Sequence, residues 1–248
     1  MDWFGRSYKQ FDFEMYSLSH FVIMSIFILV TICIFLFRKQ MQGEQWRKAE
    51  ILVGISLILI EVTYHIWMLV NGSWNVTHSI PLELCSISLV LCIILLLAKK
   101  QVVLEILFFT ALLGSTQSIF FPSLNYDFPH FRFFHFFYTH LMVVWVAFYF
   151  TWVKGFRPTF WSVIKVFTFL NILLPIILYI NKLTNGNYLY LSQKPDHFSL
   201  LDVLGPYPWY IAAMDGLVIT LSTLLWLIFR KRNAKTTNKI QTDFEHNG

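Results

Sequence analysis

One cysteine and two histidines lie near the places where apolar stretches of this sequence begin or end. Cys85 belongs to the stretch SIPLELCSISLVLC, residues 79–92, which starts with polar side chains and continues with apolar ones. His140 and His65 lie near the ends of two other apolar stretches. A thiolate is a nucleophile and an imidazole is a general base, and together they are the parts of nucleophilic catalysis. This chemistry requires that the fold bring the side chains together.

The composition indicates that a membrane-spanning bundle positions these side chains. Hydrophobic residues make up 56% of the 248 residues and charged residues 13%, whereas a soluble domain carries about 25% charged residues. A membrane-spanning helix needs about 20 mostly apolar residues. The sequence therefore predicts an all-α polytopic bundle of seven transmembrane helices in one domain, residues 1–232, followed by a disordered cytoplasmic tail, residues 233–248. The seven runs are 17–37, 49–70, 81–98, 101–121, 134–152, 160–180 and 208–229.

The distribution of Lys and Arg predicts the orientation of the bundle. The ends of the runs that we assign to the cytoplasm, together with the tail, hold 14 of the 19 Lys and Arg residues. Because positive charge favours the cytoplasmic side, we expect the N-terminus outside and the C-terminus in the cytoplasm. The net charge of +5 does not indicate nucleic-acid binding, since the basic cluster at 230–232 directly follows an apolar run.

Polar side chains gather at one depth of the predicted bundle. At about 1.5 Å of rise per residue, Cys85 and His65 lie about 6 and 8 Å inside their runs. On the same scale His140 and Asp215 lie about 9 and 10 Å inside theirs. In a hydrocarbon core of about 30 Å, this layer is near the level of the lipid esters in the outer leaflet. An ion pathway would place polar groups through the whole thickness, so the layer favours a lipid substrate or a small ligand that enters from outside.

Each cysteine also has a structural interpretation. A single cysteine in a membrane helix is more often a packing residue than a nucleophile. Ser79 and Pro81 are typical of a helix start and would place Cys85 near a helix N-terminus, where the helix dipole favours a thiolate. Cys92 and Cys33 lie deep among apolar residues, and we interpret them as packing residues.

The histidines and acids have the same two interpretations. His140 lies deep and is our candidate general base, with a structural histidine as the alternative. His135 points about 140° away on the same helix and is interpreted as nearer the surface, beside Arg132. Glu61 and His65 lie one turn apart, so Glu61 either orients the imidazole or forms a structural pair with it.

The segment 187–210 is the longest piece between the apolar runs, and it lies on the side of the polar layer. Its prolines and Gly205 predict a shaped loop. It is either a lid, with Tyr207 near the substrate and Lys194 attracting phosphate, or a rigid cap over the helix ends. Glu83, at the start of its run, is expected at headgroup level.

The motifs PLELCSIS, FHFFYTHL and SLLDVLGPYPWY, on seven predicted helices, resemble the YwaF and transmembrane protein 164 family over nearly the whole chain. The resemblance implies a coenzyme-A-independent acyltransferase that moves fatty acyl groups between phospholipids through a cysteine thioester. It implies that Cys85 is the nucleophile and that His140 is the best match to its partner histidine. Much of the bacterial branch is known simply as integral membrane protein.

The leading hypothesis from residues and resemblance is a phospholipid transacylase without a cofactor, located in the cell membrane, in a bacterium the cytoplasmic membrane. Its partners would be phospholipids and lysophospholipids of the bilayer. His140 or His65 would be the base, and Gln117 or Ser86 would donate to the oxyanion. One alternative is a zinc-dependent lipid hydrolase with ligands from His65, His78, His135, His140 and Asp215, although no His-x-x-x-His pair lies on one helix. The other is a transporter or sensor, for which Pro175 is the one indication.

Overall fold

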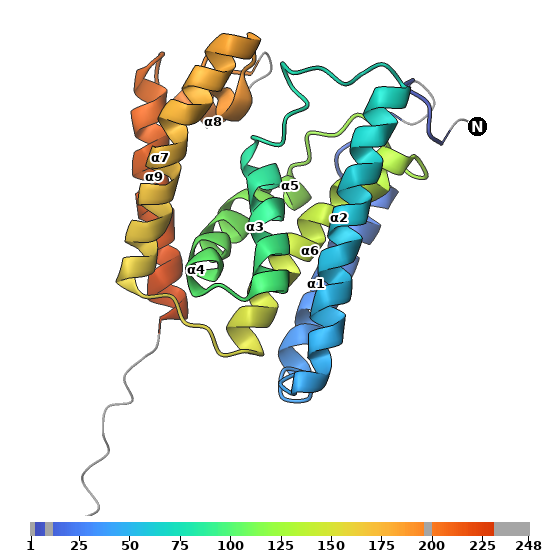
Figure 1. Cartoon of the computed structure of the whole chain (residues 1–248), viewed down its shortest axis with the longest axis vertical. Coiled ribbons are helices and arrows are strands. Elements are labelled where there is room, and N and C mark those ends of the chain that lie inside the picture. The colour runs from blue at the N-terminus through green and yellow to red at the C-terminus, as the bar shows by residue number, and fades with distance from the viewer. Residues whose placement is uncertain (1–2, 8–11, 196–199, 231–248) are drawn as a thin grey trace, which may run out of the picture.

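The computed structural model describes residues 3–7, 12–195 and 200–230, and the chain is all-α (Figure 1). Short connections join most of the elements, and the longest of the connections carries two short helices of its own. The elements are α1 (Leu18–Leu36), η1 (Glu44–Trp46), α2 (Arg47–Val70), α3 (Leu84–Ala98), α4 (Gln101–Thr110), the π-helical turn η2 (Ala111–Ser115), α5 (Thr116–Phe120), α6 (Phe131–Trp152), α7 (Phe160–Thr184), η3 (Tyr188–Tyr190), α8 (Leu200–Val203) and α9 (Trp209–Phe229).

The described residues form six helices that are long and apolar enough to cross a membrane. These are α1, η1 with α2, the continuous α4–η2–α5, α6, α7 and α9. The protein is therefore an all-α polytopic membrane protein with about six candidate spanning helices. The prediction of a seventh full span at 81–98 is wrong in its extent, because α3 has only 15 residues. The predicted tail at 233–248 lies outside the described residues.

Helix α3 is short because the chain before it is not helical. The helix begins after Glu83, whose backbone is extended, and not at Ser79 and Pro81 as the sequence suggested. Its 15 residues span about 22 Å, which is about 8 Å less than a hydrocarbon core of about 30 Å. Figure 1 shows α3 starting well below the upper end of α2, at the end of an extended segment. The first turn of α3 is thus placed inside the bundle.

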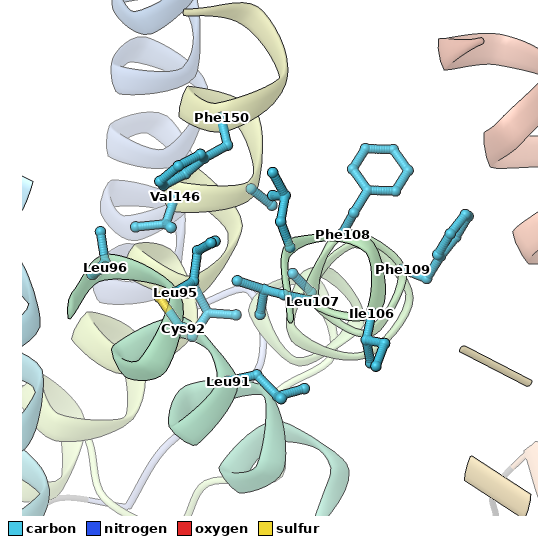
Figure 2. Close-up of a cluster of buried hydrophobic side chains, with 14 of the residues drawn as sticks. Leu91, Cys92, Leu95, Leu96, Ile106, Leu107, Phe108, Phe109, Val146 and Phe150 are labelled. Atoms are coloured by element: carbon cyan, nitrogen blue, oxygen red, sulfur yellow. The ribbon is translucent and has the colours of Figure 1, made fainter. Parts of the chain in front are cut away.

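The elements follow one another across the molecule in a simple order. Helices α9 and α7 pair at one side, α4 packs on α7, α3 and α6 lie in the middle, and α2 and α1 form the other side (Figure 1). The largest buried cluster lies where α3, α4 and α6 meet, and it includes Leu95, Leu107, Phe108 and Val146 (Figure 2). Cys92 is fully buried in this cluster, as its interpretation as a packing residue predicts.

A buried carboxylate connects the helices at the end opposite to Cys85, which we call the Glu50 end. Glu50 on α2 accepts a hydrogen bond of 2.8 Å from the hydroxyl of Tyr149 on α6. Its carboxylate also lies 3.1 Å from Arg47, 3.1 Å from Lys154 and 3.4 Å from Lys99. A single acid therefore holds α2, the α3–α4 turn and the end of α6 together.

The substitution Glu50→Gln should destabilise the bundle, because it leaves three cations around a site that no longer carries negative charge. We expect a loss of about 3 kcal/mol, or a fall of roughly 6–12 °C in the thermal unfolding midpoint of the purified protein in detergent. Glu44→Gln, at an exposed position of η1, is the matched control and should leave the midpoint unchanged. Equal midpoints for the two variants would show that the Glu50 contacts contribute no stability.

Candidate functional site

A cavity of about 360 Å³ lies at the other end of the bundle, among α2, α3, α5, α6 and the connection η3. Most of the residues that the sequence singled out line this one cavity. The structure thus brings together side chains from three separate helices and from the segment before α3. The predicted residues in its wall are Glu61, His65, His78, Glu83, Cys85, Ser86, His135 and His140.

Cys85 lies in the first turn of α3, closer to the helix start than the sequence suggested. Its thiol lies 3.3 Å from the hydroxyl of Ser118 on α5. The first N–H group to bond within the helix is that of Ile87, which donates to the carbonyl of Glu83. The N–H groups of the three residues before Ile87 therefore precede the intrahelical pattern and face the end where the helix dipole favours negative charge. A negatively charged group at this position, such as a thiolate or an oxyanion, is therefore stabilised.

The π-helical turn η2 decides which polar residues face Cys85. Such a turn widens the helix and rotates the residues that follow it. It places Ser115 and Ser118 in the cavity wall, whereas Gln117 is exposed and does not line the cavity. The position of Gln117 thus gives no support to its predicted role as an oxyanion donor. Apart from an interaction with the thiol of Cys85, the buried hydroxyl of Ser115 has no hydrogen-bond partner among the described residues.

Gly114 allows this helix to approach the start of α3. A Cβ atom at Gly114 would lie 3.2 Å from the side chain of Leu84, the first residue of α3. Glycine therefore permits the close contact that puts the two serines beside Cys85. The sequence showed a polar group at 114–118, but it held no signal for the π turn.

His140 lines the cavity and has one ring nitrogen that is not protonated. Its Nδ1 lies 2.6 Å from the carbonyl oxygen of Phe136, one turn earlier on α6. Because a carbonyl only accepts, Nδ1 carries the proton and Nε2 is the unprotonated nitrogen of the neutral ring. Within the described part of the chain, Nε2 of His140 has no hydrogen-bond partner. This is the arrangement that a general base requires.

The other histidines of the cavity have both ring nitrogens occupied. Nδ1 of His135 accepts from Arg132 at 2.8 Å, and its Nε2 donates to Glu61 at 2.9 Å. His65 accepts from Trp74 at 3.2 Å, and its Nε2 lies 3.5 Å from Glu61. The predicted pairing of Glu61 with His65 is therefore confirmed. His135 lies beside Arg132, as the sequence predicted, but its side chain is buried, with 7% exposed, because Glu61 reaches it from α2.

The connection η3 covers the segment that leads into α3. The backbone N–H of Leu189 donates to Glu83 at 3.2 Å, and Tyr190 lines the cavity. The hydroxyl of Tyr188 donates to the carbonyl of Val76 at 2.7 Å and accepts from the N–H of Ile80 at 3.0 Å. Burial raises the pKa of Tyr188, so its hydroxyl keeps the proton that it donates. Part of the predicted lid is thus a cap that is bonded to the site.

Three further predicted residues lie elsewhere. Asp215 is on α9, where its carboxyl group interacts with the side chain of Asn171 on α7. Tyr207 is exposed and lines a separate hollow. Lys194 pairs with Asp202 at 3.7 Å and does not line the cavity. The segment 196–199 of the predicted lid lies outside the described residues.

The described part of the chain contains no set of ligands for the zinc ion of the alternative hypothesis. No three His, Cys, Asp or Glu side chains there are grouped so that they could hold a metal ion. The histidines of the cavity are instead hydrogen-bonded to Glu61, Arg132, Trp74, Thr77 and two backbone carbonyls.

A comparison with protein-family models identifies the family that the sequence motifs resemble. No curated protein and no solved structure matches this chain. A model of the TMEM164 family matches residues 15–226, a stretch that includes α1 to α8 and most of α9. The match covers far more than half of the chain, including the whole cavity wall. The chain therefore belongs to the TMEM164 family.

Proposed function

We propose that this protein transfers fatty acyl groups between phospholipids through a thioester on Cys85. The observation that supports the proposal most is the shared cavity: a thiol at a helix N-terminus and a histidine with an unprotonated Nε2 line the same space. The family resemblance points to the same reaction. The cavity wall supplies a nucleophile, a base and hydrogen-bond donors, which are the parts that acyl transfer needs.

In the first step, Nε2 of His140 accepts the proton of the Cys85 thiol. The thiolate attacks the carbonyl carbon of a phospholipid ester, and the carbonyl oxygen becomes an oxyanion. The backbone N–H groups at the start of α3 and the hydroxyls of Ser115 and Ser118 are the donors for this charge. The bond from carbon to the glycerol oxygen then breaks. The oxygen takes the proton from His140 and leaves as a lysophospholipid, with the acyl group on sulfur.

In the second step, the hydroxyl of an acceptor lysophospholipid enters the cavity. His140 removes the hydroxyl proton, and the oxygen attacks the thioester carbonyl. The carbon–sulfur bond breaks, the new ester forms, and the Cys85 thiolate recovers its proton from His140. The thioester conserves the energy of the ester, so the exchange needs neither coenzyme A nor another cofactor.

A lipid substrate fits the depth of the site. If the Ala98 end of α3 lies at one boundary of a hydrocarbon core of about 30 Å, the 15-residue helix begins about 8 Å inside the opposite boundary, below the ester groups and beside the first part of the acyl chains. The Glu50 end carries the cations Arg47, Lys99 and Lys154, which favours the cytoplasmic side for that end. The cavity would then open in the outer leaflet of the cell membrane, as expected from the sequence.

The base is assigned to His140 and not to His65. Both ring nitrogens of His65 are engaged, with Trp74 and Glu61. We assign Glu61 and Arg132 the role of holding His135 and the wall of the cavity. His65 is a positioning residue in this proposal.

Replacing Cys85 should abolish acyl transfer. The purified protein in lipid nanodiscs is given a phospholipid with a labelled acyl chain and an unlabelled lysophospholipid, and the labelled product is measured. Cys85→Ala should lower the rate at least about 100-fold, since no other nucleophile replaces the thiol. Cys33→Ala, a cysteine on α1 away from the cavity, is the matched control and should keep the parent rate. A Cys85→Ala variant that transfers as well as Cys33→Ala would refute the thioester.

His140→Gln should also lower the rate, by about 100-fold or more, because general-base catalysis contributes about 10²–10⁴-fold. His65→Gln should cost about tenfold or less, because it only loosens the hold on Glu61. The same labelled assay compares the two variants, and their unfolding midpoints show whether both fold. The assignment of the base is wrong if His65→Gln loses more activity than His140→Gln.

A further inference from the structure

A second cavity lies at the Glu50 end of the bundle, far from the proposed reaction. It measures about 410 Å³ and lies between the α3–α4 turn and the segment that joins α6 to α7. Four cationic side chains line it, together with Gln101 and four apolar residues of the core. The cations are Lys99, Lys100, Lys154 and Arg157, and the apolar residues are Leu95, Leu104, Phe150 and Phe156.

The cations of this cavity are only partly neutralised. Lys99 and Lys154 share the one carboxylate of Glu50, which also serves Arg47. Lys100 and Arg157 have no ion pair among the described residues. Like charges around one small space repel each other, and the repulsion is strongest where apolar walls lower the local dielectric. The cavity therefore carries an excess of positive charge that an anion would relieve.

The backbone holds these cations in place around the cavity. Lys99 ends α3 in the left-handed conformation with φ 50°, and Gly155 turns the chain after α6 with φ +77°. The guanidinium of Arg157 donates to the carbonyls of Thr151 and Phe156 at 2.9 and 3.0 Å. The two tight turns thus bring cations from the two connections to the same cavity.

The start of α4 adds hydrogen-bond donors to the cavity. Lys100 precedes this helix without a capping side-chain bond, and the first turn contains no acid. The backbone N–H groups of that turn are therefore available to an oxygen ligand. Lysine, arginine and such N–H groups are the partners that phosphate oxygens use in proteins.

We propose that this cavity binds a phosphate group, supplied by the headgroup of an anionic phospholipid or by a soluble phosphate ester. Apolar residues line the cavity together with the cations, so a lipid headgroup would place its phosphate among the cations and leave its chains beside the helices. Basic pockets between membrane helices bind anionic headgroups in this way. The inference does not depend on the acyl-transfer proposal, because it uses no residue of the Cys85 cavity.

The test measures the thermal unfolding midpoint of the full-length protein in neutral detergent as phosphatidylglycerol is added. The variant Lys100→Gln/Arg157→Gln removes two cations of the cavity. The control Lys39→Gln/Lys48→Gln removes two exposed cations from the same end of the bundle that do not line the cavity. Parent and control should gain stability with phosphatidylglycerol, whereas the cavity variant should need about tenfold more lipid for half of the effect. Phosphatidylcholine should have no comparable effect on any of them.

Further arms distinguish the source of the phosphate. Glycerol 3-phosphate is added in place of lipid, and stabilisation of the parent but not of the cavity variant would assign the site to a soluble ester. Because Arg157 also bonds to the backbone, Lys100→Gln alone is the second variant, and native mass spectrometry counts the phosphatidylglycerol molecules that each form retains. An equal response of the cavity variants and the control to both phosphates would overturn the proposal.

Discussion

The main constraint on this structure is that helix α3 begins inside the bundle, where its surroundings are apolar. A helix start leaves backbone N–H groups without intrahelical partners, and a lipid environment provides no water to satisfy them. The chain must therefore surround this start with polar groups and must cover the extended segment that leads to it. Ser115 and Ser118 approach from the neighbouring helix, and Glu83 is bonded to the cap. These polar groups lie where the proposed acyl transfer would need hydrogen-bond donors.

The cap formed by η3 shows how another part of the fold stabilises the start of α3. Asn181 accepts from the backbone N–H of Tyr188 at 2.8 Å and donates to its carbonyl at 3.0 Å. Tyr188 in turn bonds to the backbone of Val76 and Ile80, in the segment before α3. The end of α7 is thereby connected to the entrance of α3. At the other end of the bundle, Glu50 performs a comparable task for α2, α3 and α6.

The sequence predicts the apolar helices well, because a long apolar run in a chain with few charges has few other solutions. The estimated depths also group Cys85 with His140, and the two side chains line one cavity, whereas Asp215 of the same predicted layer lies elsewhere. It misplaces the start of α3 because Ser79 and Pro81 look like a helix start, whereas the partner of Ile80 is 108 residues away. The bond between His135 and Glu61 joins residues 74 positions apart, and no local pattern reveals it. The π turn that favours Ser118 over Gln117 is equally absent from the pattern.

If the acyl group passes through Cys85, the acylated protein can be detected by its mass. The protein is mixed with a single phospholipid donor without an acceptor, quenched in acid and examined by intact-mass and peptide mass spectrometry. We expect the peptide that contains Cys85 to gain the mass of one acyl chain, and neutral hydroxylamine to remove it. Transfer activity without this adduct, or an acyl group on another residue that resists hydroxylamine, would contradict the proposal.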